Sequence, residues 1–284
     1  YSFNKSHSIA YAALAAVTVY LKFTYPKEFF LSLLKMSRHE PDPVSEVSTI
    51  QKELPHFDIQ LLPPHILDST MNFTIEGDNI RYGLLSIKGI SEKSIERIDE
   101  FKNEYSNKFD IFQAAEDAKV NLGVLCALLQ AGSLDGYYSQ SRSKMVYEAQ
   151  IWNILTAREK KWVYKFAEQY DYDLIKIIKK LISFQDEKGK PVIKESRVAT
   201  MRKKGDSYKE IYMLNSKAED FASWYYETFL LGYSYTTNLR NVFRRDGASR
   251  LTSIHESTSN ENDMRVTVAG VVEQSISRIS KNKN

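Results

Sequence analysis

Cysteine is almost absent from this 284-residue sequence, which contains only Cys126. A single thiol can form no intrachain disulfide, and it cannot supply the paired cysteine ligands of a structural zinc site. Cys126 lies in the apolar run from Val124 to Leu129. We therefore interpret it as a small core residue of a protein in a reducing, cytoplasmic setting.

The sequence also lacks a secretory-signal pattern and any uninterrupted apolar run of membrane length. The apolar stretch from Ile9 to Leu21 is broken by Tyr11, Thr18 and Tyr20, and Lys22 ends it. We therefore expect no membrane partner. The net charge of +3 is small, so overall charge alone does not indicate a nucleic-acid-binding protein.

Recognisable catalytic patterns are missing as well. The sequence contains no nucleophile triad, Walker-type phosphate loop or dinucleotide-binding glycine motif. Asp171 and Asp173 could share a metal ion on a strand, but the helical pattern around them predicts an exposed polar helix face instead. His56 and His65 lie in a proline-rich linker without a suitable set of further ligands. We expect no catalytic residue and no metal ligand within these 284 residues.

Helical patterns dominate what is present, so the sequence predicts a mainly α fold. Helices are expected over 6–36 with a break at Tyr25-Pro26, over 44–54, through most of 87–134 and over 218–230. Alternating apolar residues around Gly77-Asp78-Asn79 predict a small β-hairpin within 71–85. The residues before the prolines of 61–64 favour an extended linker, and Met264–Val272 reads as a strand.

The middle of the chain, about 141–240, is basic and is helical at both ends. Between Leu155 and Glu210 there are 15 Lys or Arg and 9 Asp or Glu, an excess of six positive charges. The segment Lys188–Lys209, with Gly189 and Gly205, predicts a loop or hairpin excursion. It is either a solvated charged loop or a surface that follows DNA.

Asn4, Lys5, Ser6 and His7 lead into the first predicted helix. The start of a helix presents unpaired backbone N–H groups and a partial positive charge, and Lys5 and His7 add two basic side chains. Such a combination can bind a phosphate group. The alternative is an ordinary helix cap between solvated polar residues, and these four residues alone do not exclude it.

A resemblance favours phosphate binding. Tyr1–Tyr11, Thr18–Lys22 and Tyr25–Phe29 closely resemble the late fingers region of the DNA polymerase III alpha subunit, the C-family replicative polymerase of bacteria. That family reads F-N-K-S-H-x-x-A-Y there, followed by x-T-A-Y-L-K-x-x-Y-P-x-E-F. The resemblance implies that Asn4–His7 lie near the phosphates of the incoming nucleotide or near the adjacent DNA backbone.

A second segment, Tyr82–Ser91, resembles the family's x-Y-G-L-x-x-I-K-G-V-G stretch, in which a helix-hairpin-helix fold holds DNA. Gly89 permits a sharp turn whose amides can point at a phosphate oxygen without approaching a base. Ser91 replaces a second glycine of the family, and its β-carbon could restrict the approach of the phosphate. The resemblance assigns DNA binding to Lys88, Gly89, Ile90, Ser91 and Lys93.

A second copy of this turn is predicted at Ala131, Gly132 and Ser133, because Leu125–Asp135 resembles the family's x-L-I-x-A-G-A-F-D element. Either turn alone would be interpreted as a helix corner that stops at a glycine. Their order after the fingers-like segment favours two tandem motifs that grip the duplex backbone across its minor groove.

The resemblance weakens toward the C-terminus. Arg265–Glu273 looks like the opening strand of the family's OB-fold, a barrel that engages single-stranded template. The implied regions are the C-terminal part of the fingers domain (1–70), the β-hairpin with tandem helix-hairpin-helix motifs (71–140), a divergent helical and basic connector (141–240), and the first strands of an incomplete OB-fold (260–284).

The implied function is template-directed DNA synthesis by a DNA polymerase (a nucleotidyltransferase) in DNA replication. Its palm aspartates would lie upstream of this chain, and Mg²⁺ would be the cofactor of the full-length enzyme. Tyr1 and the unpaired terminal strand suggest a piece of a longer protein, divergent or phage-encoded, which binds no cofactor and is inactive alone.

The implied partners are primer–template duplex, single-stranded template and dNTP. A sliding clamp and other replisome subunits are further candidates, although the sequence shows no clear clamp-binding motif. Two other classes of function stay open at this point. One is a stand-alone, non-catalytic DNA-binding adaptor with helix-hairpin-helix motifs, and the other is a protein-interaction scaffold.

Overall fold

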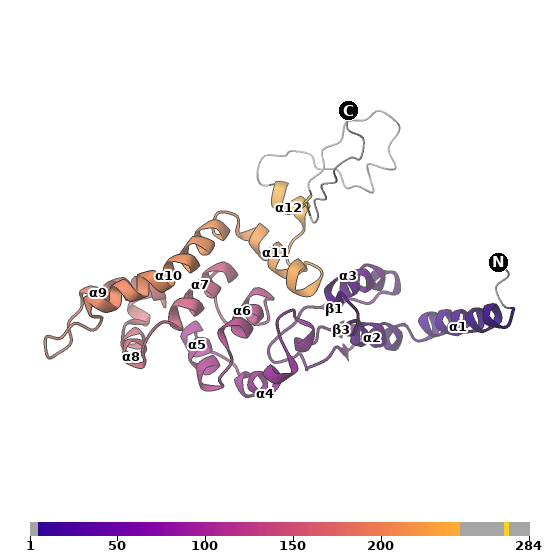
Figure 1. The fold of residues 1–284 in the computed structure, drawn as a ribbon, viewed down its shortest axis with the longest axis horizontal. Coiled ribbons are helices and arrows are strands. Elements are labelled where there is room, and N and C mark those ends of the chain that lie inside the picture. The colour runs from indigo at the N-terminus through magenta and orange to yellow at the C-terminus, as the bar shows by residue number, and fades with distance from the viewer. Residues whose placement is uncertain (1–4, 245–269, 273–284) are drawn as a thin grey trace, which may run out of the picture. The chain divides into compact units, whose positions relative to one another are not determined.

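The computed structural model describes residues 5–244 and 270–272, and Figure 1 shows the order of their helices and strands. The chain divides into two units, Tyr1–Tyr235 and Thr236–Asn284. Helices make up most of the described residues, and they are accompanied by one small sheet. The predicted mainly α fold is therefore confirmed.

The first unit begins with α1 (Lys5–Thr24) and α2 (Pro26–Ser37), which meet at the predicted break. Pro26 has no N–H group with which to continue the hydrogen-bond ladder of α1, but it suits the first turn of a new helix. α1 buries none of its side chains, whereas α2 packs against α3 (Pro43–Glu53). No single described helix is long and apolar enough to span a membrane; α1 and α2 meet that test only as a pair bent by 116°.

A three-stranded sheet follows, in the order β1-β3-β2. β2 (Thr74–Glu76) and β3 (Asn79–Arg81) form the predicted hairpin, with Gly77 in the left-handed region at its turn (φ 62°). The first two residues of the predicted linker form β1 (Leu61–Leu62), which pairs in parallel with β3, so the linker prediction is wrong for them. Pro63 directly follows β1 and cannot donate to a ladder, which limits the strand to two residues.

Four helices after the sheet contribute much of the apolar core. α4 is amphipathic, because Ile95, Ile98 and Phe101 are buried while charged residues occupy its other face. An ion pair between nearly fully buried side chains joins α5 to α7, with Lys108 Nζ 2.6 Å from Glu148 Oε2. The helices are α4 (Glu92–Phe101), α5 (Lys108–Asp117), α6 (Leu122–Gln130) and α7 (Arg142–Trp152).

The basic connector is helical through most of its length. The predicted excursion is confined to a turn at Gly189, where Gln185 and Pro191 form an isolated β-bridge. Gly205 lies within a helix instead, and an added β-carbon there would lie 3.0 Å from Ile151 Cδ1, so the helix packs closely at this point. The connector helices are α8 (Ala157–Phe166), α9 (Leu174–Ser183), α10 (Glu195–Asn215) and α11 (Glu219–Leu231).

The end of α11 joins the connector to the sheet region. Tyr82 Oη donates a hydrogen bond to the carbonyl oxygen of Leu231 (3.2 Å), and Tyr233 Oη donates to that of Leu61 (3.1 Å). Both bonds are buried, so they fix the position of α11 relative to β1 and β3. This contact places α11 next to the region predicted to bind DNA.

The second unit contains α12 (Leu239–Arg244). Of the strand predicted from Met264 to Val272, only residues 270–272 are described, and these three lie in no strand. The predicted start of an OB-fold therefore lies outside the described residues.

Candidate nucleic-acid interface

The first predicted turn is an exposed hairpin between a 3₁₀ turn, η2 (Leu84–Ser86), and α4. Gly89 has a φ of 94°, which glycine adopts without strain, and an added β-carbon would meet nothing within 4 Å. Ile90 is buried beneath the turn, whereas Lys88, Ser91 and Lys93 are exposed. The hairpin thus presents its backbone and two cations to solvent.

Backbone donors at this hairpin are available to an anion. Within the part of the chain that the structure describes, the amides of Gly89 and Ser91 donate to no protein acceptor. Ser91 precedes α4, whose first amides have no acceptor in their own helix. The hydroxyl of Ser91 does not cap these donors, because its Oγ lies 3.3 Å from Ser94 Oγ. The serine therefore leaves the amides uncovered.

A second exposed hairpin joins α5 to α6, and the sequence analysis missed it. Lys119 is exposed and has a φ of 57°, Val120 is buried, and Asn121 is exposed. The side chain of Asn121 caps α6 by accepting a hydrogen bond from Val124 N (2.9 Å). Among the described residues, nothing accepts from the amide of Asn121 itself.

The two hairpins repeat one pattern, and their left-handed residues lie 30 positions apart in the sequence. Each has a left-handed residue, then a buried β-branched residue, then a polar residue that precedes a helix: Gly89-Ile90-Ser91 and Lys119-Val120-Asn121. Arg97 of α4 links them, because its Nη1 donates to the carbonyl oxygen of Lys119 (3.1 Å). Lys119 takes the place of a glycine in the second hairpin, so a glycine pattern does not indicate it, although an asparagine before an apolar helix is a recognisable start signal.

The turn at Ala131–Ser133, which was predicted to bind DNA, lies in the interior. Gly132 has a φ of 77°, and an added β-carbon would lie 2.1 Å from Tyr235 Oη and 2.2 Å from Arg142 Nη2. Glycine is needed there because two side chains cover it. In this conformation the turn has a packing role, and DNA binding by Ala131, Gly132 and Ser133 stays a prediction.

Arg142 is the centre of a buried polar cluster over this glycine. Its guanidinium donates to Glu227 Oε1 (2.6 Å), Asp135 Oδ2 (2.5 Å) and Tyr235 Oη (2.9 Å). Glu227 is fully buried and also accepts from Ser234 Oγ (2.6 Å). Burial opposes the charge of Arg142, but the hydrogen bond to Asp135 and the nearby negative groups outweigh it and raise the pKa of Arg142. This arginine therefore joins α7 to α11 and is unavailable to DNA.

The predicted phosphate-binding residues at the N-terminus lie elsewhere in the unit. Asn4 is outside the described residues, and Lys5, Ser6 and His7 are exposed in the first turn of α1. Lys22 and Phe23, near the other end of α1, contact Glu53 and Phe57, roughly 25 Å along the helix from Lys5. The structure does not bring Lys5–His7 into one site with the hairpins.

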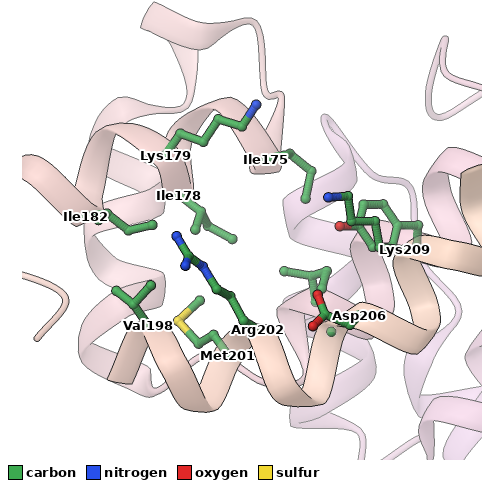
Figure 2. A pocket seen from close by; sticks show the side chains of 12 residues that line it. Ile175, Ile178, Lys179, Ile182, Val198, Met201, Arg202, Asp206 and Lys209 are labelled. Carbon is green, nitrogen blue, oxygen red and sulfur yellow. The ribbon is translucent and has the colours of Figure 1, made fainter. Parts of the chain in front are cut away.

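A pocket of about 170 Å³ lies among α7, α9 and α10 (Figure 2). Apolar side chains from α9 and α10 line it, together with the basic residues Lys179, Arg202 and Lys209. Asp206 is the single carboxylate among the lining residues, which include no histidine, cysteine or serine. We assign no reaction to this pocket.

No group of three or more His, Cys, Asp or Glu among the described residues could hold a metal ion. Asp173 has a structural role, because its Oδ1 accepts a hydrogen bond from Lys176 N (2.9 Å) and caps α9. Asp171 occupies a left-handed turn (φ 50°) two residues earlier. We therefore derive no metal-dependent step from this part of the chain.

Comparison with known proteins agrees with the hairpin geometry. Residues 58–145 match the family model of a helix-hairpin-helix motif. This range includes both exposed hairpins, and it ends before the connector helices α8 to α11. The prediction that this part of the chain contains a helix-hairpin-helix motif is confirmed.

Curated relatives of the chain include DNA polymerase III alpha subunits. The chain is 37% identical to that of Aquifex aeolicus over 139 residues (48% of this chain, 12% of the relative). The identity is 33% over 145 residues for Thermus aquaticus (50% and 12%) and 32% over 140 residues for Deinococcus radiodurans (48% and 10%). The chain thus spans a small fraction of the length of these relatives, and the predicted resemblance to this family is confirmed.

Proposed function

We propose that this chain is the DNA-gripping part of a replicative DNA polymerase related to the DNA polymerase III alpha subunit. The observation that carries the proposal is the pair of matching hairpins. Each has an exposed left-handed residue and an amide at the helix start that has no acceptor among the residues that the structure describes. Both hairpins lie within the helix-hairpin-helix match. Two such sites, held together by Arg97, suit two phosphates of one duplex.

The first hairpin would bind a phosphate through the amides of Gly89 and Ser91 and the positive end of α4. Lys88 and Lys93 flank these donors and add positive charge. Glu92, in the first turn of α4, would repel a phosphate, but it forms an ion pair with Arg38. That pairing reduces the repulsion and leaves the site suited to an anion.

The second hairpin would bind another phosphate at the start of α6. Its donors are the amide of Asn121 and the first amides of the helix, where Gly123 is exposed and adds no side chain. Lys119 supplies the cation. Neither hairpin presents groups arranged to read a base edge, so binding would depend on the backbone and not on the sequence.

The test is the affinity of the 284-residue chain for labelled blunt duplexes of unrelated sequence, measured by fluorescence anisotropy at several salt concentrations. We expect similar Kd values for the different sequences, together with a linear fall of log K with log salt concentration. Absence of binding at low salt, or a strong preference for one sequence, would contradict the proposal.

The start of α1 would serve the same enzyme at another point. Lys5 and His7, in the first turn of a helix without an acidic residue there, would attract the phosphates of the incoming nucleotide. In a complete polymerase that includes this segment, Lys5→Ala should raise the apparent KM for dNTP. The matched variant Lys35→Ala, at the far end of α2, should leave it unchanged.

The catalytic palm would lie in another part of the polypeptide, so the 284 residues alone would not extend a primer. Metal-dependent primer extension by the purified chain would contradict this. The same assay on the complete protein separates a polymerase from a DNA-binding adaptor, because only the polymerase extends the primer.

A further inference from the structure

Lys88 in the first hairpin lies against α11, where its side chain contacts one aromatic ring of that helix. Its backbone amide donates to the carbonyl oxygen of Leu230 (3.1 Å), and its Nζ lies 4.0 Å from the centroid of the Phe229 ring. The rings of Tyr225 and Phe229 are nearly parallel, at 7°, with centroids 5.9 Å apart. An aromatic pair therefore adjoins the phosphate-binding turn, although α11 lies outside the residues that match the helix-hairpin-helix motif.

The two rings are unusually open for their size. Tyr225 and Phe229 are each 48% exposed. Aromatic side chains usually bury most of their large apolar surface, so an aligned pair at the surface suits a ligand that covers it. The ligand must also fit the cation over Phe229 and the amides of Gly89 and Ser91, which have no acceptor among the described residues.

We propose that Tyr225 and Phe229 form a stacking platform for an unpaired nucleobase whose strand is held at the first hairpin. This inference rests on the proposed DNA binding by that hairpin. A nucleotide offers a flat aromatic face and a negative phosphate together, which is the combination that the platform and the hairpin require. An apolar protein segment would cover the rings but would leave Lys88 and the amides without an anion.

The platform would distinguish single-stranded from paired DNA. Inside a duplex both faces of a base are covered by its neighbours, whereas an unpaired base has a face that can lie on Tyr225. Every base has a π-face, and stacking is therefore tolerant of sequence. The hairpins would hold the duplex while the platform holds the first unpaired nucleotides beside it.

Three labelled DNAs test this inference with the 284-residue chain. The first is a blunt duplex, the second carries a short single-stranded extension, and the third carries an extension of the same length made of abasic sites. The abasic extension keeps the phosphates and removes the bases. We expect the chain to bind the base-bearing extension about 5- to 150-fold more tightly than the abasic one, from the usual contribution of one stacked base.

Tyr225→Ala should remove most of that preference and leave the affinity for the blunt duplex unchanged, whereas Tyr225→Trp should retain the preference. Tyr20→Ala is the matched control, because Tyr20 is also an exposed aromatic residue but lies on α1. Equal affinity of the wild-type chain for the base-bearing and abasic extensions would overturn the platform. Equal losses on all three DNAs with Tyr225→Ala would overturn it too. Failure of the wild-type chain to bind even the blunt duplex would instead refute the proposed function.

Discussion

Replacement of Gly132 by alanine distinguishes a packing role from a DNA-binding role. The new β-carbon would lie 2.1 Å from Tyr235 Oη and 2.2 Å from Arg142 Nη2. A left-handed φ costs alanine about 1–2 kcal/mol, and displacement of well-packed neighbours costs about 1–3 kcal/mol more. We therefore expect Gly132→Ala to lower the free energy of unfolding by about 2–5 kcal/mol.

Gly89→Ala is the matched variant, because Gly89 also has a left-handed φ, of 94°, but has open space around its α-carbon. Only the backbone cost applies there, about 1–2 kcal/mol. The new methyl group would occupy the surface that faces the phosphate, so duplex affinity should fall while stability falls less than in Gly132→Ala.

Both variants can be compared by urea denaturation and by duplex binding at a temperature at which each is folded. The account predicts a larger loss of stability for Gly132→Ala and a larger loss of duplex affinity for Gly89→Ala. A stable Gly132→Ala variant with weakened DNA binding would refute the burial argument and support the phosphate contact first predicted for that turn.

Three further outcomes follow from buried or paired groups. Glu227→Ala should lower the free energy of unfolding by about 3–5 kcal/mol in urea denaturation, because it removes one partner of the buried guanidinium of Arg142. Glu187 is exposed, so the control variant Glu187→Ala should change this free energy by less than about 0.5 kcal/mol. Burial raises the pKa of Asp173, but the hydrogen bond from Lys176 N and the charges of Lys144 and Lys176 lower it by more. The pKa of Asp173 is therefore below its usual value. The ionised Asp173 therefore stabilises the fold fully above its pKa in the unfolded chain, and this stabilisation is lost as pH falls through its pKa in the folded chain. Asp173→Asn should reduce the loss of Tm that the wild-type chain shows below about pH 4. A pH profile of Tm that is the same in both proteins would contradict this. Burial raises the pKa of Cys126 to about 12, so alkylation by iodoacetamide at pH 8 should be roughly a thousandfold slower than for a free cysteine, and rapid labelling of the folded chain would contradict it.

Local patterns predicted the helices and the first hairpin well, for identifiable physical reasons. Pro26 stops one helix and starts the next, and Gly77 and Gly89 occupy left-handed positions that favour glycine. These features depend on neighbours in the chain, so the sequence carries them directly.

Local patterns do not suffice where distant residues decide the structure. Gly132 and Gly89 have similar sequence surroundings, but Arg142 and Tyr235 cover only Gly132. Lys119 occupies a left-handed position that the sequence pattern reserves for glycine. The alignment of Tyr225 and Phe229 with Lys88 depends on how α11 returns to the sheet, which no local pattern reveals.

The salt dependence of duplex binding tests most directly the claim that two hairpins grip one duplex. Each lysine that contacts a phosphate adds about 0.9 to the slope of log K against log salt concentration. The account predicts that Lys88→Ala and Lys119→Ala each reduce the slope by about 0.9, and that the double variant reduces it by about 1.8. Lys165→Ala is the matched control, since Lys165 Nζ likewise lies over an aromatic ring, 4.2 Å from the centroid of Trp162, and it should leave the slope unchanged. An unchanged slope in the folded double variant would contradict the account.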